Sequence, residues 1–484
     1  MRLAIASSLA VAVGIFAFAA LFGVAGSALV SGLVAAAAAA GAAWWFHRRP
    51  PLELDEAAAP RGLRILAALS ATLALVQLAR LAVFMVAPAA TGCSWLPASD
   101  WEIRHSCVSA YYVAAELADS VANVYDEKLY SAADDDPARP RKARMIGPFR
   151  VDTYEYPPPF LLLPRALRLL APSFDAFRSL WFGLNGGFIL FAFVALARAL
   201  GRTTGTRALL LSPLVWLALP TLSTLQKGNV QAAVVAASML AMLLFARGRN
   251  VAGGALLAFV TASKLFPGLL GVYLLARRQW RAAAWTFAFG LLFTLLTLLD
   301  LGWAPFAAFL DHAPGLLSGE SFPAFRNPAA TAINLSVPGV VFKLKFFGLP
   351  GLSFGASKLV GWIYTLIATA AVWMAGRRGT RAGGEPLAWL AILLLATLRS
   401  PFLPQAYAVF PPLWLLTLLA AERAPDPRRL AGVLLAWAAL NVYWPTDWPL
   451  DPRWLSLLIL VPQALTFALA AIALRRAAPL GAGR

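Results

Sequence analysis

The chain has 484 residues, of which 60% are hydrophobic and only 13% are charged. Soluble globular proteins carry about twice that charged fraction, so the composition excludes an ordinary soluble domain. The formal net charge of +18 is compatible with nucleic-acid binding, but the basic residues cluster between apolar segments, as in Arg277-Arg278 and Arg377-Arg378. Such clusters are typical of the cytoplasmic loops of membrane proteins. We therefore expect a lipid bilayer as a partner and no nucleic acid.

Apolar segments of about the length that crosses a bilayer recur from end to end. The first two, residues 3–22 and 28–45, predict a helical hairpin, with a cleaved signal peptide as the alternative interpretation of the first. Because backbone amides in hydrocarbon must be satisfied within their own segment, such segments become helices. The sequence predicts an all-α polytopic membrane bundle of about twelve transmembrane helices in a bacterial inner membrane. The further apolar segments cover residues 63–86, 179–199, 230–245, 285–299, 358–374, 407–421 and 454–474.

These segments divide the chain into three parts. Residues 1–60 form an N-terminal transmembrane hairpin with a cytoplasmic loop, residues 61–425 a transmembrane core, and residues 426–484 a C-terminal transmembrane hairpin. The core contains a large first outer loop, residues 88–157. Long loops in compact proteins are commonly functional, so we expect this one to contribute to a site.

The two cysteines of the chain, Cys93 and Cys107, both lie in this outer loop. The outer face of a bacterial inner membrane is oxidising, which permits a disulfide between them. Two unrelated free thiols are the alternative. Because no Cys/His spacing is typical of a zinc site, we expect no metal and no cofactor.

One apolar segment, residues 251–276, is flanked by basic clusters on both sides. It is interrupted by Ser263-Lys264-Leu265-Phe266-Pro267. Proline removes a backbone hydrogen bond and disfavours helix at the residue before it. We expect a broken, re-entrant helix pair that directs Lys264 into a cavity, since such breaks occur only where they are buried or line water. A kinked ordinary span with Lys264 extending to the interface is the alternative.

The remaining polar residues gather on the outer side of the predicted membrane. No nucleotide-binding glycine motif, Ser-His-Asp order or HExxH motif is present. Acids, cations and aromatic residues on one face indicate a site for a phosphorylated, hydroxyl-rich ligand, in which cations bind the phosphate and a carboxylate accepts a proton. Arg399 and Lys227 stand out because a cation at the outer end of a span departs from the usual charge bias.

Several short sequence motifs follow one another along the chain in a characteristic order. They are Tyr112-Val113-Ala114-Ala115 and Val124-Tyr125-Asp126 in the outer loop, Tyr156-Pro157-Pro158, Lys227-Gly228-Asn229, the Lys264 break, Asn334-Leu335-Ser336 and Arg399-Ser400-Pro401. Their order resembles that of polyprenyl-phosphate-sugar-dependent glycosyltransferases of the GT-C type. The closest resemblance is to glycosyltransferase family 87, which includes polyprenol-phosphomannose-dependent α-mannosyltransferases.

The resemblance implies a GT-C-like catalytic core and a membrane-bound hexosyltransferase. A polyprenyl-phosphate sugar, expected to carry mannose, would donate to a hydroxyl of a glycolipid or polysaccharide acceptor with inversion at the anomeric carbon. Asp100 or Glu102 would be the general base, and Lys264, Arg399 and Arg326 would neutralise the leaving phosphate. The expected substrate-binding residues are Tyr112, Tyr156, Lys227, Asn229, Lys264, Arg326, Asn334 and Arg399.

The sequence departs from the family pattern at the expected catalytic acid. The family has an aspartate about four residues before the tyrosine of its Tyr-x-Ala-Ala element, and this position is Val108 here. Asp100 and Glu102 lie further upstream. Two other classes remain open, an O-antigen ligase or polymerase and a lipid or solute transporter. The single broken helix and the early position of the large loop favour the glycosyltransferase.

Overall fold

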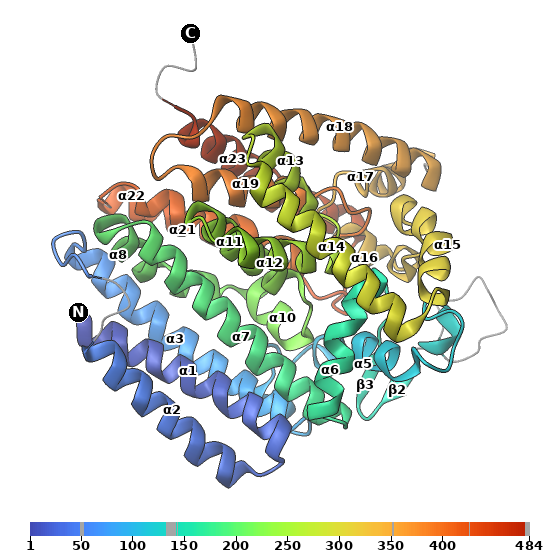
Figure 1. Cartoon of the computed structure of the whole chain (residues 1–484), viewed down its shortest axis with the longest axis horizontal. Helices are drawn as coiled ribbons and strands as arrows, with labels where there is room; N and C mark the ends of the chain where they lie inside the picture. The colour runs from blue at the N-terminus through green and yellow to red at the C-terminus, as the bar shows by residue number, and fades with distance from the viewer. Residues whose placement is uncertain (49–52, 132–141, 143, 351–352, 425, 480–484) are drawn as a thin grey trace.

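Long helices packed side by side make up most of the molecule in a computed structural model that describes residues 1–48, 53–131, 142, 144–350, 353–424 and 426–479 (Figure 1). Among these residues, 7 helices are long and apolar enough to cross a membrane, and a bent pair (Arg202–Leu217 with Leu219–Lys227, 66°) makes up to 8. The multi-pass helical membrane fold is confirmed, but the expected number of about twelve spans is not. The long helices are α1 (Arg2–Ala25), α2 (Ala28–Arg48), α3 (Arg61–Val86), α7 (Phe174–Ala199), α14 (Trp280–Leu301), α18 (Phe354–Arg378) and α23 (Pro452–Ala477).

Shorter helices fill the space between the long ones. In chain order these helices are α4 (Asp100–Arg104), α5 (Val108–Leu117), α6 (Leu162–Leu170), α8 (Arg202–Leu211), α9 (Pro213–Leu217), α10 (Leu219–Lys227), α11 (Gln231–Ala246), α12 (Asn250–Ser263), α13 (Gly268–Ala276), α15 (Ala304–Ser318), α16 (Pro328–Ala332), α17 (Val340–Lys343), α19 (Glu385–Thr397), α20 (Gln405–Ala408), α21 (Phe410–Ala421) and α22 (Pro427–Leu440). Several of them begin at or next to a proline, as α9 and α16 do.

The centre of the bundle and its perimeter differ in exposure. Helices α11, α19 and α21 are buried along almost their whole length. Helices α2 and α18 lie at opposite edges (Figure 1), and they present large apolar side chains outward, such as Leu366 at 70% exposed. Apolar side chains on the outside of a multi-pass bundle are solvated by lipid tails.

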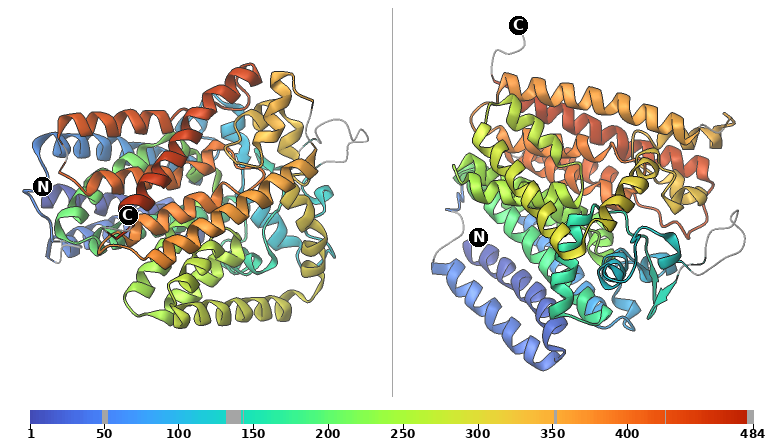
Figure 2. Two further views of the ribbon diagram at one scale, coloured as in Figure 1. Left: turned by 90° about the horizontal axis from the view of Figure 1, so that it is seen from above. Right: turned by 45° about the vertical axis from the view of Figure 1, so that its right-hand side comes forward.

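The described part of residues 88–157, which the sequence predicts as an outer loop, folds into a small layer at one end of the helices, beside α15 (Figures 1 and 2). Three short strands form its sheet in the order β1-β3-β2: β1 (His105–Ser106) is parallel to β3 (Phe149–Val151), and β2 (Met145–Ile146) is antiparallel to β3. We call residues 88–157 the loop layer; residues 132–141 and 143 within it lie outside the described residues.

Arg178 on α7 connects this loop layer to the membrane helices. Its guanidinium donates to the carbonyl oxygens of Phe84 (2.9 Å) and Met85 (3.2 Å), at the end of α3 where helix carbonyls lack partners. The same group lies over the rings of Phe84 (4.6 Å) and Phe149 of β3 (4.3 Å). One fully buried side chain therefore joins α3, α7 and the sheet.

Two predictions about the chain can be compared directly with the fold. The break at Lys264 is present, because α12 ends at Ser263 and α13 begins only at Gly268. The disulfide is absent: Cys93 and Cys107 are both free thiols. Cys107 instead stands directly before α5, and its sulfur atom contacts the Tyr407 hydroxyl at 3.1 Å.

Close contact between α1 and α7 depends on glycine. A Cβ atom added at Gly183 would lie 2.5 Å from the carbonyl oxygen of Phe16 and 2.6 Å from the amide nitrogen of Ala20. Both are backbone atoms, which cannot move aside without separating the helices. Small residues commonly allow this approach between membrane helices.

We expect Gly183→Ala to lower the free energy of unfolding by about 1–3 kcal/mol, the usual cost of overpacking. The matched control is Gly187→Ala, one turn away, where a new Cβ would make an ordinary 3.9 Å contact with Phe16. Denaturation in mixed micelles compares the two variants. Equal stability of both variants and wild type would contradict the close packing of α1 on α7.

Candidate active site

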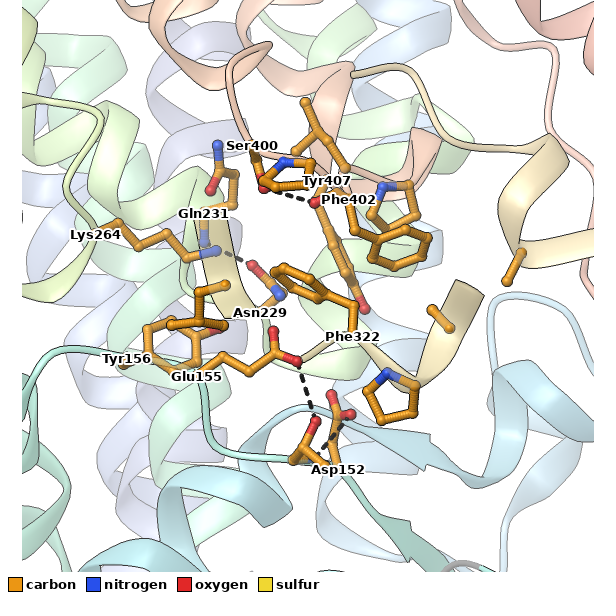
Figure 3. Close-up of a pocket in the computed structure, with 18 of the residues that line it drawn as sticks. Asp152, Glu155, Tyr156, Asn229, Gln231, Lys264, Phe322, Ser400, Phe402 and Tyr407 are labelled. Atoms are coloured by element: carbon orange, nitrogen blue, oxygen red, sulfur yellow. Dashed lines mark hydrogen bonds between the residues drawn. The ribbon is translucent and has the colours of Figure 1, made fainter. Parts of the chain in front are cut away.

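A cavity of about 1180 Å³ lies where the loop layer meets the helix ends. This volume exceeds the roughly 300–1,000 Å³ of ordinary small-molecule sites, so it has room for a ligand larger than a single sugar. Its walls come from the loop layer, the α10–α11 turn, the α12–α13 break, residues 309–333 and the segments of α18, α19 and α20 (Figure 3). Segments far apart in sequence therefore supply the site.

The parallel pairing of β1 with β3 determines which loop-layer residues meet. His105 is paired with Arg150 and Ser106 with Val151. The residues that follow the two strands, Cys107 and Asp152, consequently emerge at the same edge of the sheet. The Nε2 atom of His105 lies 3.7 Å from Oδ2 of Asp152 and 3.6 Å from Sγ of Cys107.

Two carboxylates, Asp152 and Glu155, stand at this end of the cavity (Figure 3). Burial raises the pKa of Asp152 to about 6. Burial, and next the charge of Asp152, raise the pKa of Glu155 well above its usual value. The Oε1 atom of Glu155 accepts a hydrogen bond from the Thr153 hydroxyl (3.2 Å), and among the described residues no other hydrogen bond holds this carboxylate. Desolvated carboxylates of this kind bind protons more strongly than solvated ones.

The thiol and the imidazole beside Asp152 are both held in their neutral forms. Burial raises the pKa of the Cys107 thiol to about 12. Burial, with the charges of Lys227 and Arg150, lowers the pKa of His105 well below its usual value. The His105 ring is fixed in place by stacking on Trp101, with ring centres 4.5 Å apart. This cluster therefore adds little positive charge to the acidic end.

Lys264 and Arg399 both line the cavity, and neither has an ionic partner among the described residues. Lys264 lies in the extended segment between α12 and α13, with its Nζ atom 5.1 Å from the centre of the Tyr156 ring. Arg399 follows α19; its Nε donates to Thr365 (3.1 Å) and its terminal nitrogens have no hydrogen-bond partner in the described part of the chain. Unpaired cations in a partly buried cavity are suited to an anionic ligand.

The turn after α10 brings Lys227 and Asn229 to the cavity wall. Gly228 makes this turn possible with a φ of 69°, a conformation that favours glycine. A Cβ there would overlap the side chain of Val108. The Asn229 side chain reaches the sulfur of Cys107 (3.5 Å), so the turn also supports the cluster around His105.

Lys227 is not free to bind an anion, because it forms a buried ion pair with Glu102. Its Nζ atom lies 2.6 Å from Oε1 of Glu102, whose carboxylate also accepts from Tyr443 (2.7 Å), Ser223 (2.8 Å) and Trp95 (2.8 Å). Glu102 is completely buried and does not line the cavity as the described residues define it. Its oxygens are therefore occupied by structural contacts.

Asp100, the other predicted base, lies on the outside of the loop layer. Its carboxylate pairs with Arg104 (2.6 Å) and Arg150 (2.9 Å), and its side chain is 52% exposed. It too is missing from the cavity wall formed by the described residues. The structure therefore does not bring either predicted acid to the cavity.

The predicted substrate-binding residues divide into two groups. The cavity wall includes Tyr156, Lys227, Asn229, Lys264, Arg326 and Arg399. Arg326 is paired with Glu127 (2.9 Å) at the rim. Tyr112 instead packs against Phe174 and Phe177 in the core, with its hydroxyl donating to the carbonyl oxygen of Pro172.

The side chain of Asn334 holds the backbone of a segment that lines the cavity. Its side-chain nitrogen donates to the carbonyl oxygen of Pro401 (2.8 Å), and its side-chain oxygen accepts from the amide of Leu403 (2.9 Å). These bonds fix the segment after Arg399. Asn334 is fully buried, so its side chain has a structural role and does not face the cavity.

The family model of glycosyltransferase family 87 matches residues 154–404, slightly more than half of the chain. This chain belongs to glycosyltransferase family 87. Comparison with curated proteins and with solved structures found no match. The family 87 enzyme is thus a membrane glycosyltransferase, as the order of its motifs predicts, and the transporter alternative is not supported.

The matched region includes some of the site residues and leaves out the two acids predicted from the sequence. It contains Glu155, Lys264 and Arg399, whereas Asp100 and Glu102 precede it. Sequence reasoning did not select Asp152, Glu155, His105, Cys107 or Tyr407 as site residues of the family 87 enzyme. The one available signal was the position of Asp152 and Glu155 immediately before Tyr156-Pro157-Pro158, an element already recognised as part of the family pattern.

Proposed function

We propose that this enzyme transfers a hexose from a polyprenyl-phosphate donor to an acceptor hydroxyl at the outer face of the bacterial inner membrane. Mannose is the first sugar to test, on the basis of the family resemblance, and a glycolipid or polysaccharide is the expected acceptor. One observation carries the proposal: in one cavity, and among the described residues, Lys264 and Arg399 have no ionic partner and one oxygen of Glu155 has no hydrogen-bond partner.

The cations are suited to the phosphate of the donor. As the bond between the anomeric carbon and the phosphate oxygen breaks, negative charge accumulates on the leaving polyprenyl phosphate. Lys264 and Arg399 would stabilise that charge in a cavity shielded from bulk water, where fixed cations are most effective. Arg326 would act at the rim, where Glu127 already balances part of its charge.

The isoprenoid tail of the donor requires an apolar path to the bilayer. The cavity wall includes Leu265 and Trp362, which are also among the exposed apolar side chains of the molecule at 62% and 47%. Trp362 belongs to α18 at the edge of the bundle and lies under the guanidinium of Arg399 at 5.6 Å. An exposed apolar wall next to a phosphate-binding cation suits a lipid-linked donor.

We propose Glu155, rather than Asp100 or Glu102, as the general base. The acceptor oxygen attacks the anomeric carbon while its proton passes to the carboxylate of Glu155, and the polyprenyl phosphate departs from the opposite side with inversion. A carboxylate with a raised proton affinity is an efficient acceptor in such a step. Glu155 lines the cavity and retains an oxygen without a described partner, whereas the oxygens of Glu102 are all engaged.

The proposal is tested by transfer of radiolabelled mannose from polyprenyl-phosphate mannose to acceptor lipids in proteoliposomes. Wild-type enzyme is expected to form labelled product. If donors carrying mannose, glucose, galactose and arabinose all give no product with membrane extracts as the acceptor source, the proposed donor class is wrong.

Lys264→Ala is expected to lower kcat/KM for the donor by about 10- to 100-fold, since a bond to a charged group contributes about 1.5–3 kcal/mol. The same assay measures this change. Lys345→Ala is the matched control, because Lys345 is exposed, lies outside the cavity wall and contacts only Phe346 among the interactions described. Equal losses in both variants would show that Lys264 has no specific role with the phosphate.

A further inference from the structure

His105, Cys107 and Asp152 form a cluster of three different metal-ligating groups at the acidic end of the cavity. One nitrogen, one sulfur and one carboxylate oxygen from these residues all lie within 4.8 Å of one another. The cluster is a product of the parallel β1–β3 pairing, which places residues 45 positions apart in sequence at one edge of the sheet. His105 and Asp152 both line the cavity, so the cluster is accessible to a ligand from that side.

Two of the three ligand separations within the cluster are close to those required by a tetrahedral cation. With zinc–sulfur and zinc–nitrogen bonds of about 2.3 and 2.0–2.1 Å, tetrahedral geometry separates the sulfur from the nitrogen by about 3.6 Å. The observed distance from Cys107 Sγ to His105 Nε2 is 3.6 Å. The nitrogen-to-oxygen separation required is about 3.4 Å, and His105 Nε2 lies 3.7 Å from Asp152 Oδ2. The third separation, between the Cys107 sulfur and an Asp152 oxygen, is within 4.8 Å, compared with about 3.6 Å in a tetrahedral site. A rotation of the Asp152 side chain toward the sulfur would close the triangle.

The surroundings hold these ligands in position. Trp101 stacks on the His105 ring, and the Asn229 side chain contacts Cys107 Sγ. The Tyr407 hydroxyl contacts both Cys107 Sγ (3.1 Å) and His105 Nε2 (3.3 Å), and it gives up the contact with Nε2 when the cation binds. The nearby ammonium of Lys227 is neutralised by its pair with Glu102, which reduces its repulsion of a bound cation. In metal sites, contacts from neighbouring residues to the ligating side chains hold those side chains in the orientation that the metal requires.

We propose that His105, Cys107 and Asp152 bind a zinc-type divalent cation with its fourth coordination position open to the cavity. Cys107 binds as the thiolate, and its proton is released to solvent when the cation binds. Mixed nitrogen, sulfur and oxygen ligands in tetrahedral arrangement suit zinc better than magnesium or calcium, which prefer oxygen ligands. Three protein ligands with one open position are typical of catalytic zinc sites, whereas structural sites are closed by four.

The open position suggests how the cation acts, and this part rests on the proposed function. The acceptor hydroxyl binds to the cation, which lowers the pKa of that hydroxyl. Its proton then passes to Glu155, its oxygen forms the new bond to the anomeric carbon, and the bond to phosphate breaks. The cation is unchanged by the reaction and needs no oxidant or reductant.

Metal binding is tested on the full-length enzyme, purified with a tag that contains no histidine. Elemental analysis by mass spectrometry is expected to find about one zinc per chain, as for a single three-ligand site. Replacement of zinc by cobalt should produce a near-ultraviolet charge-transfer band from the cysteine sulfur. Cys107→Ser is expected to abolish that band, and His105→Ala to weaken zinc binding by at least about 10- to 100-fold. Cys93→Ser is the matched control and should retain both the band and the zinc.

A second measurement uses only the wild-type chain, in case a variant fails to fold. Zinc is expected to raise the denaturation midpoint of the wild-type chain, because it binds the folded state, and a chelator is expected to reverse that increase. Absence of zinc in wild type, or a cobalt spectrum unaffected by Cys107→Ser, overturns the inference. Either result leaves the proposed transfer reaction standing, because that reaction is judged by product formation with Glu155 and Lys264 variants.

Discussion

Glu155→Gln is expected to lower the rate of sugar transfer by about 10²–10⁴-fold, the usual contribution of a general base. Glutamine keeps the shape of the side chain and can still accept from Thr153, but it cannot take the proton of the acceptor hydroxyl. Binding of the donor should change little, since the phosphate is assigned to cations elsewhere in the cavity. Single-turnover transfer in proteoliposomes and donor binding by calorimetry separate these two effects.

Two carboxylates outside the cavity wall serve as controls for this variant. Glu116→Gln removes a carboxylate that is 39% exposed and pairs with Arg168, and it should change transfer by less than about twofold. Asp100→Asn should behave in the same way if Asp100 only stabilises the surface of the loop layer. Loss of transfer in Asp100→Asn, with activity retained in Glu155→Gln, would restore the assignment made from the sequence.

Lys227→Met is expected to lower the free energy of unfolding by about 3–5 kcal/mol, the cost of leaving a buried partner charge uncompensated. The Glu102 carboxylate would remain completely buried and would accept hydrogen bonds from the neutral donors of Trp95, Ser223 and Tyr443. Denaturation in mixed micelles, followed by tryptophan fluorescence, measures the loss.

The double variant Glu102→Leu with Lys227→Met should recover part of this stability, because it removes both charges at once. An exposed pair provides the comparison: Arg453 and Asp451 are 66% and 49% exposed, so Arg453→Met should cost less than about 1 kcal/mol. A Lys227→Met variant as stable as wild type, with weaker donor binding, would instead return Lys227 to the substrate-binding role expected from the sequence.

The membrane fold and part of the site could be predicted because they depend on local features of the chain. Apolar length predicts spans, and Pro267 predicts the interruption that presents Lys264. Arg399 and Lys227 stood out because they depart from the charge bias of membrane loops. The number of spans was harder to predict, since the bundle contains many short helices, such as α12 and α13, whose role in crossing the membrane depends on packing.

The acidic end of the site could not be predicted because it depends on strand pairing between distant segments. Nothing local indicates that residues 105–106 pair with residues 150–151, and without this pairing His105, Cys107 and Asp152 have no reason to be considered together. The same limit explains why Glu102 looked like a free acid. Its buried partner Lys227 is 125 positions away in sequence.

The contacts of Arg178 have a practical consequence for protein engineering. Its guanidinium holds the last carbonyls of α3 and the Phe149 ring of β3 at the same time. An excised soluble fragment containing only residues 88–157 would lose this anchor, as would a chimaera that exchanges those residues between relatives. Grafts intended to change acceptor choice should therefore carry the end of α3 and the first half of α7 together with the loop.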